Sequence, residues 1–183
     1  MFQLTNAASG ILERAHLDMP ASRRESEFGY RFQSLVAAAL KCRAGLDDLY
    51  ENKGAGQPDC YSAAGGYGFE IKTRADSPVE LDENSWSALP KYPNPRLVAM
   101  LTTTAPFPIW VLDLQGLARG PIRMDAGLRA DSDLEAHLKT HLSALVEAVG
   151  TARLTKPERS DFDRATSEIA AKIFATRTNR GGS

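Results

Sequence analysis

The stretch that decides the fold covers residues 58–74 and reads PDCYSAAGGYGFEIKTR. Apolar and charged residues alternate from residue 69 to residue 74, which is the pattern of a strand with one packed face and one charged face. The small residues at 63–66 predict a hairpin turn. We therefore expect two neighbouring antiparallel strands that bring Asp59 beside Glu70.

The charged face of this hairpin has the composition of a metal-dependent hydrolytic site. Residues two apart in a strand project to the same side, about 6.6 to 6.8 Å apart, so Lys72 joins Asp59 and Glu70. Paired carboxylates on rigid strands suit Mg²⁺, for which Mn²⁺ can substitute, and the backbone carbonyl of Ile71 is a candidate further ligand. This set is suited to phosphodiester hydrolysis, because the metal activates water and neutralises phosphoryl charge. A lysine beside two acids stays protonated, so we expect Lys72 to orient the water and stabilise charge.

These residues also carry a family resemblance. Pro58-Asp59, a gap of ten residues and Glu70-Ile71-Lys72 resemble the PD-(D/E)xK signature of the restriction-endonuclease-like nuclease superfamily. The likeness covers about residues 25–115, including the segment around Trp86 and the strand after it. It implies a mixed central β-sheet flanked by helices and a Mg²⁺-dependent DNA endonuclease that leaves a 5′-phosphate. A restriction or other DNA-defence role is the setting that the resemblance implies.

The family often has a further acid on the first helix, and two residues here are candidates for that place. Glu27 precedes Gly29, and Gln33 follows it. The sequence leaves both open as the group that completes the catalytic site. Arg74 follows Lys72 on the same strand face, so we expect it to bind a phosphate of the nucleic acid. Further basic residues that could line a DNA groove are Lys41, Arg43, Lys53, Lys91 and Arg96.

Helices and further strands are predicted on both sides of the hairpin. Apolar residues recur at three- and four-residue steps in several segments, and two apolar runs near the middle of the chain have the composition of strands. Ser26 is a candidate cap for one helix, and Gly150 is expected just beyond the end of another. The expected helices are 6–17, 27–41, 132–149 and 157–175, with an 81–89 segment after the hairpin, and the expected strands are 97–104 and 107–114.

Composition sets the class of protein. The chain has 183 residues, of which 43% are hydrophobic and 25% charged, close to the globular average. We predict one α/β domain over residues 1–183, with a nuclease-like core at about 25–115 and C-terminal helices at about 132–176. No apolar run reaches the length of a membrane span, so a cytoplasmic protein without a membrane partner is expected. Its predicted partner is DNA, expected to be double-stranded, and a homodimer would serve the cutting of both strands.

Several alternative interpretations stay open, among them an RNA-cutting toxin on the same core. Glu70, Lys72 and Arg74 could be the solvated face of an edge strand. The chain could also be a non-catalytic nucleic-acid-binding or assembly subunit that keeps the nuclease fold. His137 and His141 have the four-residue spacing of a helical metal site, but no glutamate follows the first histidine, and a half-buried structural pair is the preferred interpretation.

Overall fold

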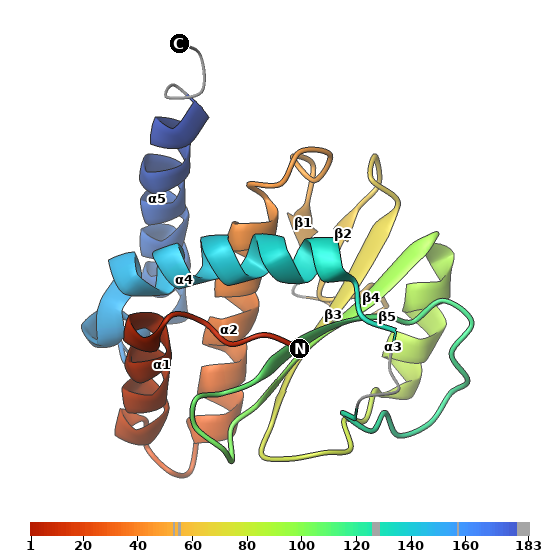
Figure 1. The fold of residues 1–183 in the computed structure, drawn as a ribbon, viewed down its shortest axis with the longest axis horizontal. Coiled ribbons are helices and arrows are strands. Elements are labelled where there is room, and N and C mark those ends of the chain that lie inside the picture. The colour runs from red at the N-terminus through yellow and green to blue at the C-terminus, as the bar shows by residue number, and fades with distance from the viewer. Residues whose placement is uncertain (53, 55, 126–128, 157, 179–183) are drawn as a thin grey trace.

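The computed structural model describes residues 1–178 apart from residues 53, 55, 126–128 and 157, and describes no side chain beyond residue 175. It has an α/β fold with a mixed sheet (Figure 1). The helices are α1 (Asn6–Asp18), α2 (Arg24–Leu40), α3 (Glu83–Ala88), α4 (Ser132–Leu154) and α5 (Arg159–Thr178), with a 3-10 helix, η1 (Leu89–Lys91). The strands are β1 (Tyr50–Glu51), β2 (Cys60–Ser62), β3 (Tyr67–Arg74), β4 (Asn94–Leu101) and β5 (Ile109–Asp113).

The five strands form one sheet in the order of the sequence, β1-β2-β3-β4-β5. The predicted hairpin is confirmed: β2 pairs antiparallel with β3, with Cys60 opposite Phe69 and Ser62 opposite Tyr67. β3 and β4 are parallel, and the chain crosses between them through α3 and η1. A parallel pair needs such a crossover, because a short turn can only reverse the chain.

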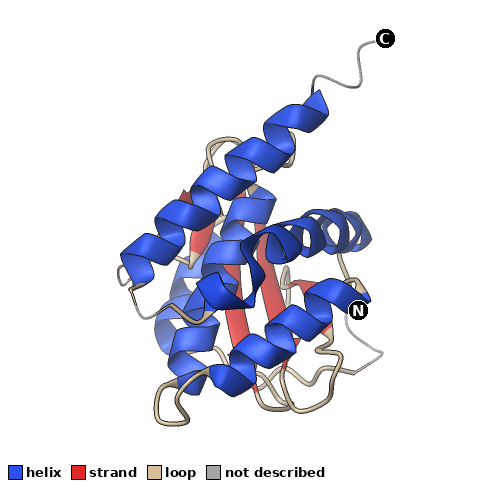
Figure 2. Cartoon of the chain, turned by 90° about the vertical axis from the view of Figure 1, so that its left-hand side faces the viewer, coloured by secondary structure: helices blue, strands red, loops and turns tan. Residues whose placement is uncertain are grey.

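The helices cover the two faces of the sheet unequally. Figures 1 and 2 show α1, α2, α4 and α5 on one side of the strands, whereas α3 lies on the other side. Phe69, Ile71 and Val98 belong to the hydrophobic cluster beneath the four helices. Leu97 and Trp86 belong to a smaller cluster beneath α3. The alternation of residues along β4 and β5 therefore supplies both clusters, whereas β3 supplies only the first, because its other face carries Glu70 and Lys72.

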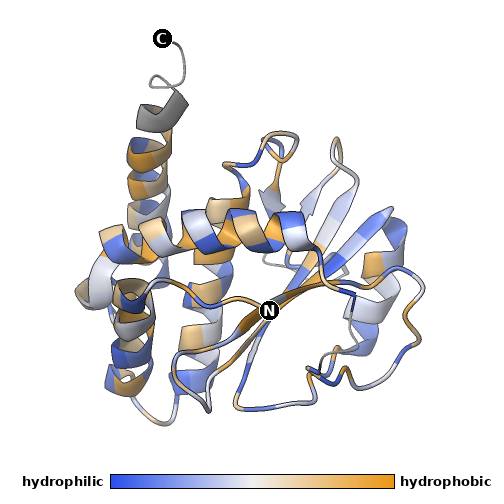
Figure 3. Cartoon of the chain, viewed as in Figure 1, coloured by the Kyte–Doolittle hydropathy of each residue, from blue (hydrophilic) through white to orange (hydrophobic). Residues whose placement is uncertain are grey.

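The helix predicted at 132–149 is confirmed as the main part of α4. Its leucines are buried on one side, and Figure 3 shows apolar and polar colours alternating along it. The Asp131 side chain accepts a hydrogen bond from the Leu134 N–H at 3.1 Å, which satisfies a free donor at the helix start. Gly150 has φ +70°, so the regular helix breaks where the sequence placed its end, and one more turn follows to Leu154.

Several predicted boundaries are wrong. α2 begins at Arg24, three residues before the predicted start, and Ser26 does not cap it, because its hydroxyl donates to the Arg23 carbonyl inside the first turn. β4 covers Asn94–Leu101, whereas the prediction was 97–104. Proline lacks the N–H that an interior strand residue donates. Pro95 lies beyond the last β4–β5 pair, Arg96 with Asp113, so the missing N–H breaks no bond of that ladder. β1 was not predicted, since two residues give no readable pattern.

The other predicted segments agree with the structure. The segments 6–17 and 107–114 match α1 and β5 to within two residues at each end, and α5 begins two residues later than predicted. Pro157, the predicted start of the last helix, lies outside the described residues. Among the helices that the structure describes, none has both the length and the apolar character needed to cross a bilayer.

Candidate active site

Asp59 reaches the position beside Glu70 that the hairpin predicts. It directly precedes β2, whose pairing with β3 ends at Cys60 opposite Phe69. Beyond this pair, the Asp59 side chain replaces a backbone acceptor, since its Oδ2 accepts the Ile71 N–H at 2.8 Å. Because this bond satisfies a strand donor, it fixes the carboxylate against the edge of β3.

Lys72 lies between the two acids. Its Nζ is 2.6 Å from Glu70 Oε1 and 3.8 Å from Asp59 Oδ2. The two carboxylate oxygens cannot be further apart than the sum of these distances. Opposite ligands of an octahedral Mg²⁺ ion are about 4.2 Å apart, so one ion could bridge the two acids only if the Lys72 ammonium moved out from between them.

The interpretation of this face as the solvated side of an edge strand is wrong. β3 lies in the middle of the sheet between β2 and β4, and Glu70 is 4% exposed. A buried carboxylate is costly unless it is paired and hydrogen-bonded. Glu70 meets this requirement through Lys72 and through a second partner on α3.

That second partner is Ser85, which the sequence analysis did not identify. The Ser85 hydroxyl lies 2.7 Å from Glu70 Oε1 and 2.9 Å from Asp82 Oδ1. It carries one proton and can donate to one carboxylate at a time. Asp82 is the N-cap of α3 and accepts the Ser85 N–H at 2.7 Å. The spacing of Asp82 and Ser85 signals the helix start, but only the packing of α3 on β3 brings the hydroxyl to Glu70.

Burial and neighbouring charges change the pKa of Asp59 and of Lys72. Burial raises the pKa of Asp59 to about 6, and the neighbouring Glu70 adds to the rise, while Lys72 and the Ile71 N–H oppose it. Burial alone would lower the pKa of Lys72, but the charges of Asp59 and Glu70 outweigh it and raise this pKa above its ordinary value. The lysine is therefore a protonated counterion at neutral pH, and Asp59 is a carboxylate held in surroundings that oppose its charge.

A divalent cation fits this donor set. The N–H and C=O groups of one residue in a strand point to the same edge, so the Ile71 carbonyl faces the side where its N–H meets Asp59. Within the described part of the chain, no group of three or more His, Cys, Asp or Glu side chains is placed to hold a metal. An ion here would thus rest on Asp59, Glu70 and the Ile71 carbonyl, with water or substrate oxygens completing its shell, as is common for Mg²⁺.

Glu27 does not join these residues. It lies in the first turn of α2, where its carboxylate is 2.9 Å from Arg159 Nη2 and 3.6 Å from Arg31 Nη2. The hydrogen bond from Arg159 lowers the pKa of Glu27. Residues two apart on a helix point in different directions, and it is Gly29 that faces the sheet.

Gln33 lies on α2, which covers the face of the sheet opposite to the Glu70 and Lys72 side chains (Figure 1). A Cβ on Gly29 would be 3.0 Å from Thr73 Oγ1, so this face of α2 rests on β3. Further along α2, Ser34 donates to Glu51, which lies across β2 from Phe69. The helix therefore runs antiparallel to β3, and Gln33, one turn after Gly29, lies level with Ile71.

The basic residues predicted to contact nucleic acid have different environments. Arg74 is exposed at the end of β3, on the face of Glu70 and Lys72, and donates to the Thr73 carbonyl at 2.9 Å. Arg96 is buried and pairs with Asp113 at 2.9 Å and with Asp131 at 2.8 Å, so its predicted place in a DNA groove is wrong. Lys53 lies outside the described residues.

The two histidines on α4 are half-buried, as preferred from the sequence. The rings of His137 and His141 stack with centroids 4.0 Å apart. His137 Nε2 is 2.9 Å from the Ala39 carbonyl, and His141 Nδ1 is 2.9 Å from the His137 carbonyl. Since a carbonyl oxygen only accepts, these two nitrogens carry protons and do not serve as metal ligands.

Comparisons with known proteins add no further information on this site. No protein-family model matches the chain. No curated protein matches it, and no solved structure does.

Proposed function

We propose that this protein is a Mg²⁺-dependent DNA endonuclease with a restriction-endonuclease-like core. The observation that carries the proposal is the meeting of Asp59, Glu70 and Lys72 on one face of the sheet, where β2 pairs with β3. Two acids from neighbouring strands and a lysine two residues after the second acid are the arrangement that the PD-(D/E)xK resemblance implies. The raised pKa of Asp59 supports a cation at this place, because a positive ion would offset the burial of this carboxylate and its repulsion from Glu70.

Each group has a role in hydrolysis of a phosphodiester. Asp59 and Glu70, with the Ile71 carbonyl, would hold the cation, which lowers the pKa of a bound water and neutralises phosphoryl charge. Lys72, protonated, donates to the attacking water or to a phosphoryl oxygen and so orients the nucleophile. Ser85 acts as a positioning residue, since its hydroxyl holds the Glu70 carboxylate in one orientation.

The wider setting follows from the same resemblance. Arg74 would bind a phosphate that flanks the scissile one, because it is exposed on the face of Lys72. The product would carry a 5′-phosphate, and restriction or DNA defence is the biological role that we propose. A two-fold dimer would cut both strands of a duplex.

A specific observation favours a second candidate function. Gln33, not an acid, lies level with Ile71, and the Lys72 ammonium fills the space between the carboxylates as a structural counterion would. Both features suit a nucleic-acid-binding or assembly subunit that keeps the fold without cleaving DNA. The two functions differ in whether bound DNA is cut when the metal is supplied.

The experiment that separates them is a cleavage assay on the purified protein. Supercoiled plasmid, linear duplex, single-stranded DNA and RNA are incubated with Mg²⁺, with Mn²⁺ or with EDTA. We expect metal-dependent nicking that Asp59→Asn and Lys72→Met abolish, whereas Asp76→Asn, an exposed acid elsewhere on the chain, leaves it unchanged. Tight binding with intact DNA in both metals would favour the second candidate. Nicking that survives Asp59→Asn would refute the proposed site.

A further inference from the structure

Three tyrosine rings form a row at the β1 end of the sheet. Tyr50 in β1 lies 5.4 Å from Tyr61 in β2, and Tyr61 lies 5.7 Å from Tyr92 just after η1, measured between ring centroids. Tyr50 is 57% exposed, and the other two are half-buried. The row is thus a continuous aromatic surface that is open to solvent at one end.

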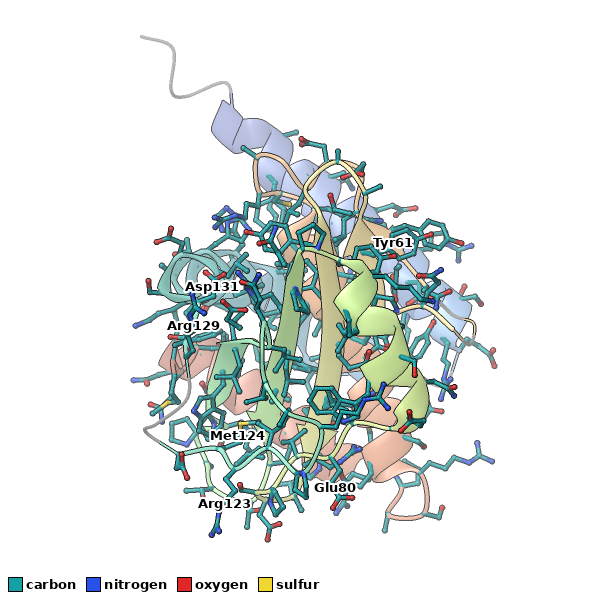
Figure 4. All side chains as sticks on the ribbon, turned by 90° about the vertical axis from the view of Figure 1, so that its right-hand side faces the viewer. Tyr61, Glu80, Arg123, Met124, Arg129 and Asp131 are labelled. Atoms are coloured by element: carbon teal, nitrogen blue, oxygen red, sulfur yellow. The ribbon has the colours of Figure 1, made fainter. Side chains whose placement is uncertain are left out.

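This tyrosine row lies on the same face of the sheet as the candidate active site. Tyr50 pairs with Tyr61, and Tyr61 pairs with Gly68, so these residues share one face. Asp59, two residues before Tyr61, shares that face, as does Glu70, two residues after Gly68. Figure 4 looks at this face, with α3 in front of the strands and Tyr61 labelled near the edge.

Local contacts fix the third ring. A Cβ on Gly68 would lie 2.7 Å from the Tyr92 ring, so the ring can lie against β3 only because this residue is glycine. The Tyr92 hydroxyl donates to Gln57 Oε1 at 3.0 Å and is held at its outer end as well. The chain therefore holds an aromatic ring in place on the surface beside the site.

The row does more than stabilise β1. A cross-strand aromatic pair strengthens a short strand, and Tyr50 with Tyr61 does so here. That purpose is served by burial, yet Tyr50 leaves more than half of its surface in water. Exposed aromatic rings beside a polar catalytic site are suited to stacking with flat, partly polar ligand groups.

We propose that the tyrosine row stacks the unpaired bases of a DNA strand whose phosphate lies at Asp59, Glu70 and Lys72. This inference rests on the proposed function, which makes that phosphate the scissile one. Tyr61 is one strand repeat, about 6.6 to 6.8 Å, from Asp59 along the chain. The row is therefore within reach of bases that neighbour the scissile phosphate on the same strand.

The ligand must be unpaired for this contact to form. Inside a duplex the base faces are covered by their neighbours, whereas a single strand or an opened end exposes them. Base–aromatic stacking does not depend on which base is present, so the row confers a preference for strand state and not for sequence. The substrate class is therefore DNA with a single-stranded segment beside the cut.

Equilibrium binding tests this inference without cleavage. Fluorescence anisotropy in EDTA compares a labelled oligothymidine single strand with a blunt duplex, for the full chain and for Tyr61→Leu, Tyr61→Phe and Tyr50→Leu. Loss of one stacking ring should weaken single-strand binding by about 5- to 150-fold and change duplex binding less than twofold. Tyr61→Phe keeps the ring and should bind within about twofold of the native chain. Thermal melting checks that each variant is folded. If Tyr61→Leu is unstable, Tyr50→Leu at the exposed end of the row still tests the inference.

The outcomes separate this inference from the proposed function. Single-strand binding unaffected by both leucine variants, or an equal loss on single strand and duplex, overturns the stacking inference even if the chain cuts DNA. A selective loss of single-strand binding in a protein that cuts nothing supports the tyrosine row as a base-stacking surface and refutes the proposed cleavage. A native chain that binds neither DNA overturns the stacking inference, and the cleavage assay with metal decides the proposed function separately.

Discussion

Replacing Asp59 by asparagine should make the metal-free protein more stable while it removes activity. The carboxylate is buried beside Glu70, and these surroundings raise the pKa of Asp59 from 3.8 to about 6. Asparagine keeps an oxygen that can accept the Ile71 N–H and has no charge to bury. A residue that costs stability in the isolated protein is expected where a site is built to bind a cation.

The magnitude and its pH dependence follow from the pKa difference between the two states. The folded protein holds the Asp59 proton more tightly than the unfolded chain does. The stability from this proton is therefore complete below pH 3.8 and is lost as the pH rises through about 6. Asp59→Asn avoids that loss, so its extra free energy of unfolding should grow from about 1 kcal/mol at pH 4.5 to about 3 kcal/mol at pH 7.5.

Urea unfolding at several pH values measures this difference, with Asp76→Asn as the control because Asp76 is exposed. The control should match the native chain at every pH. Adding Mg²⁺ should stabilise the native chain, by about 2.7 kcal/mol at one hundred times its dissociation constant, and should leave Asp59→Asn unchanged. The cost assigned to burying the Asp59 carboxylate is wrong if Asp59→Asn is no more stable than the native chain at pH 7.5, or if its advantage does not increase between pH 4.5 and 7.5.

Three further substitutions probe the site and its support. Lys72→Met removes the cation between two acids and should lower the free energy of unfolding at pH 7.5 by about 3 kcal/mol, with less loss at pH 4. Urea unfolding measures both values, and an equal loss at the two pH values would contradict an electrostatic cause. Ser85→Ala should slow plasmid nicking by about 10- to 100-fold with little change in DNA binding, since it frees the Glu70 carboxylate; unchanged rates would show that Ser85 does not position it. Gly68→Ala should lower stability by about 1 to 3 kcal/mol, because its Cβ would overlap the tyrosine ring that rests on it. The matched change Gly10→Ala, with nothing within 4 Å of the new carbon, should instead raise stability by about 0.5 to 1 kcal/mol; thermal melting decides both.

The sequence predicted those parts of the site that depend on local geometry. Strand alternation places Glu70 and Lys72 on one side, and the glycine turn brings Asp59 opposite Glu70. Both follow from backbone geometry within one hairpin. The same alternation identified Phe69 and Ile71 as core residues, because one face of a strand in a globular protein has to pack.

The groups that the sequence could not assign all depend on contacts between distant segments. Ser85 reaches Glu70 only because α3 packs on β3, and no local pattern carries that information. The choice between Glu27 and Gln33 depends on the rotation of α2 over the sheet, which Gly29 sets by its close approach to Thr73. The pairing of Arg96 with two distant acids likewise follows from tertiary packing.

By itself the sequence determined an α/β chain with a hairpin that presents two carboxylates and an ammonium, because the alternation of side chains is a property of the extended backbone. Only the tertiary structure decided that β3 lies inside the sheet, that Glu70 is buried and that three tyrosines line up beside the site. Burial and long-range pairing depend on which elements pack together, and that is set by the summed free energy of the whole fold and not by any one segment.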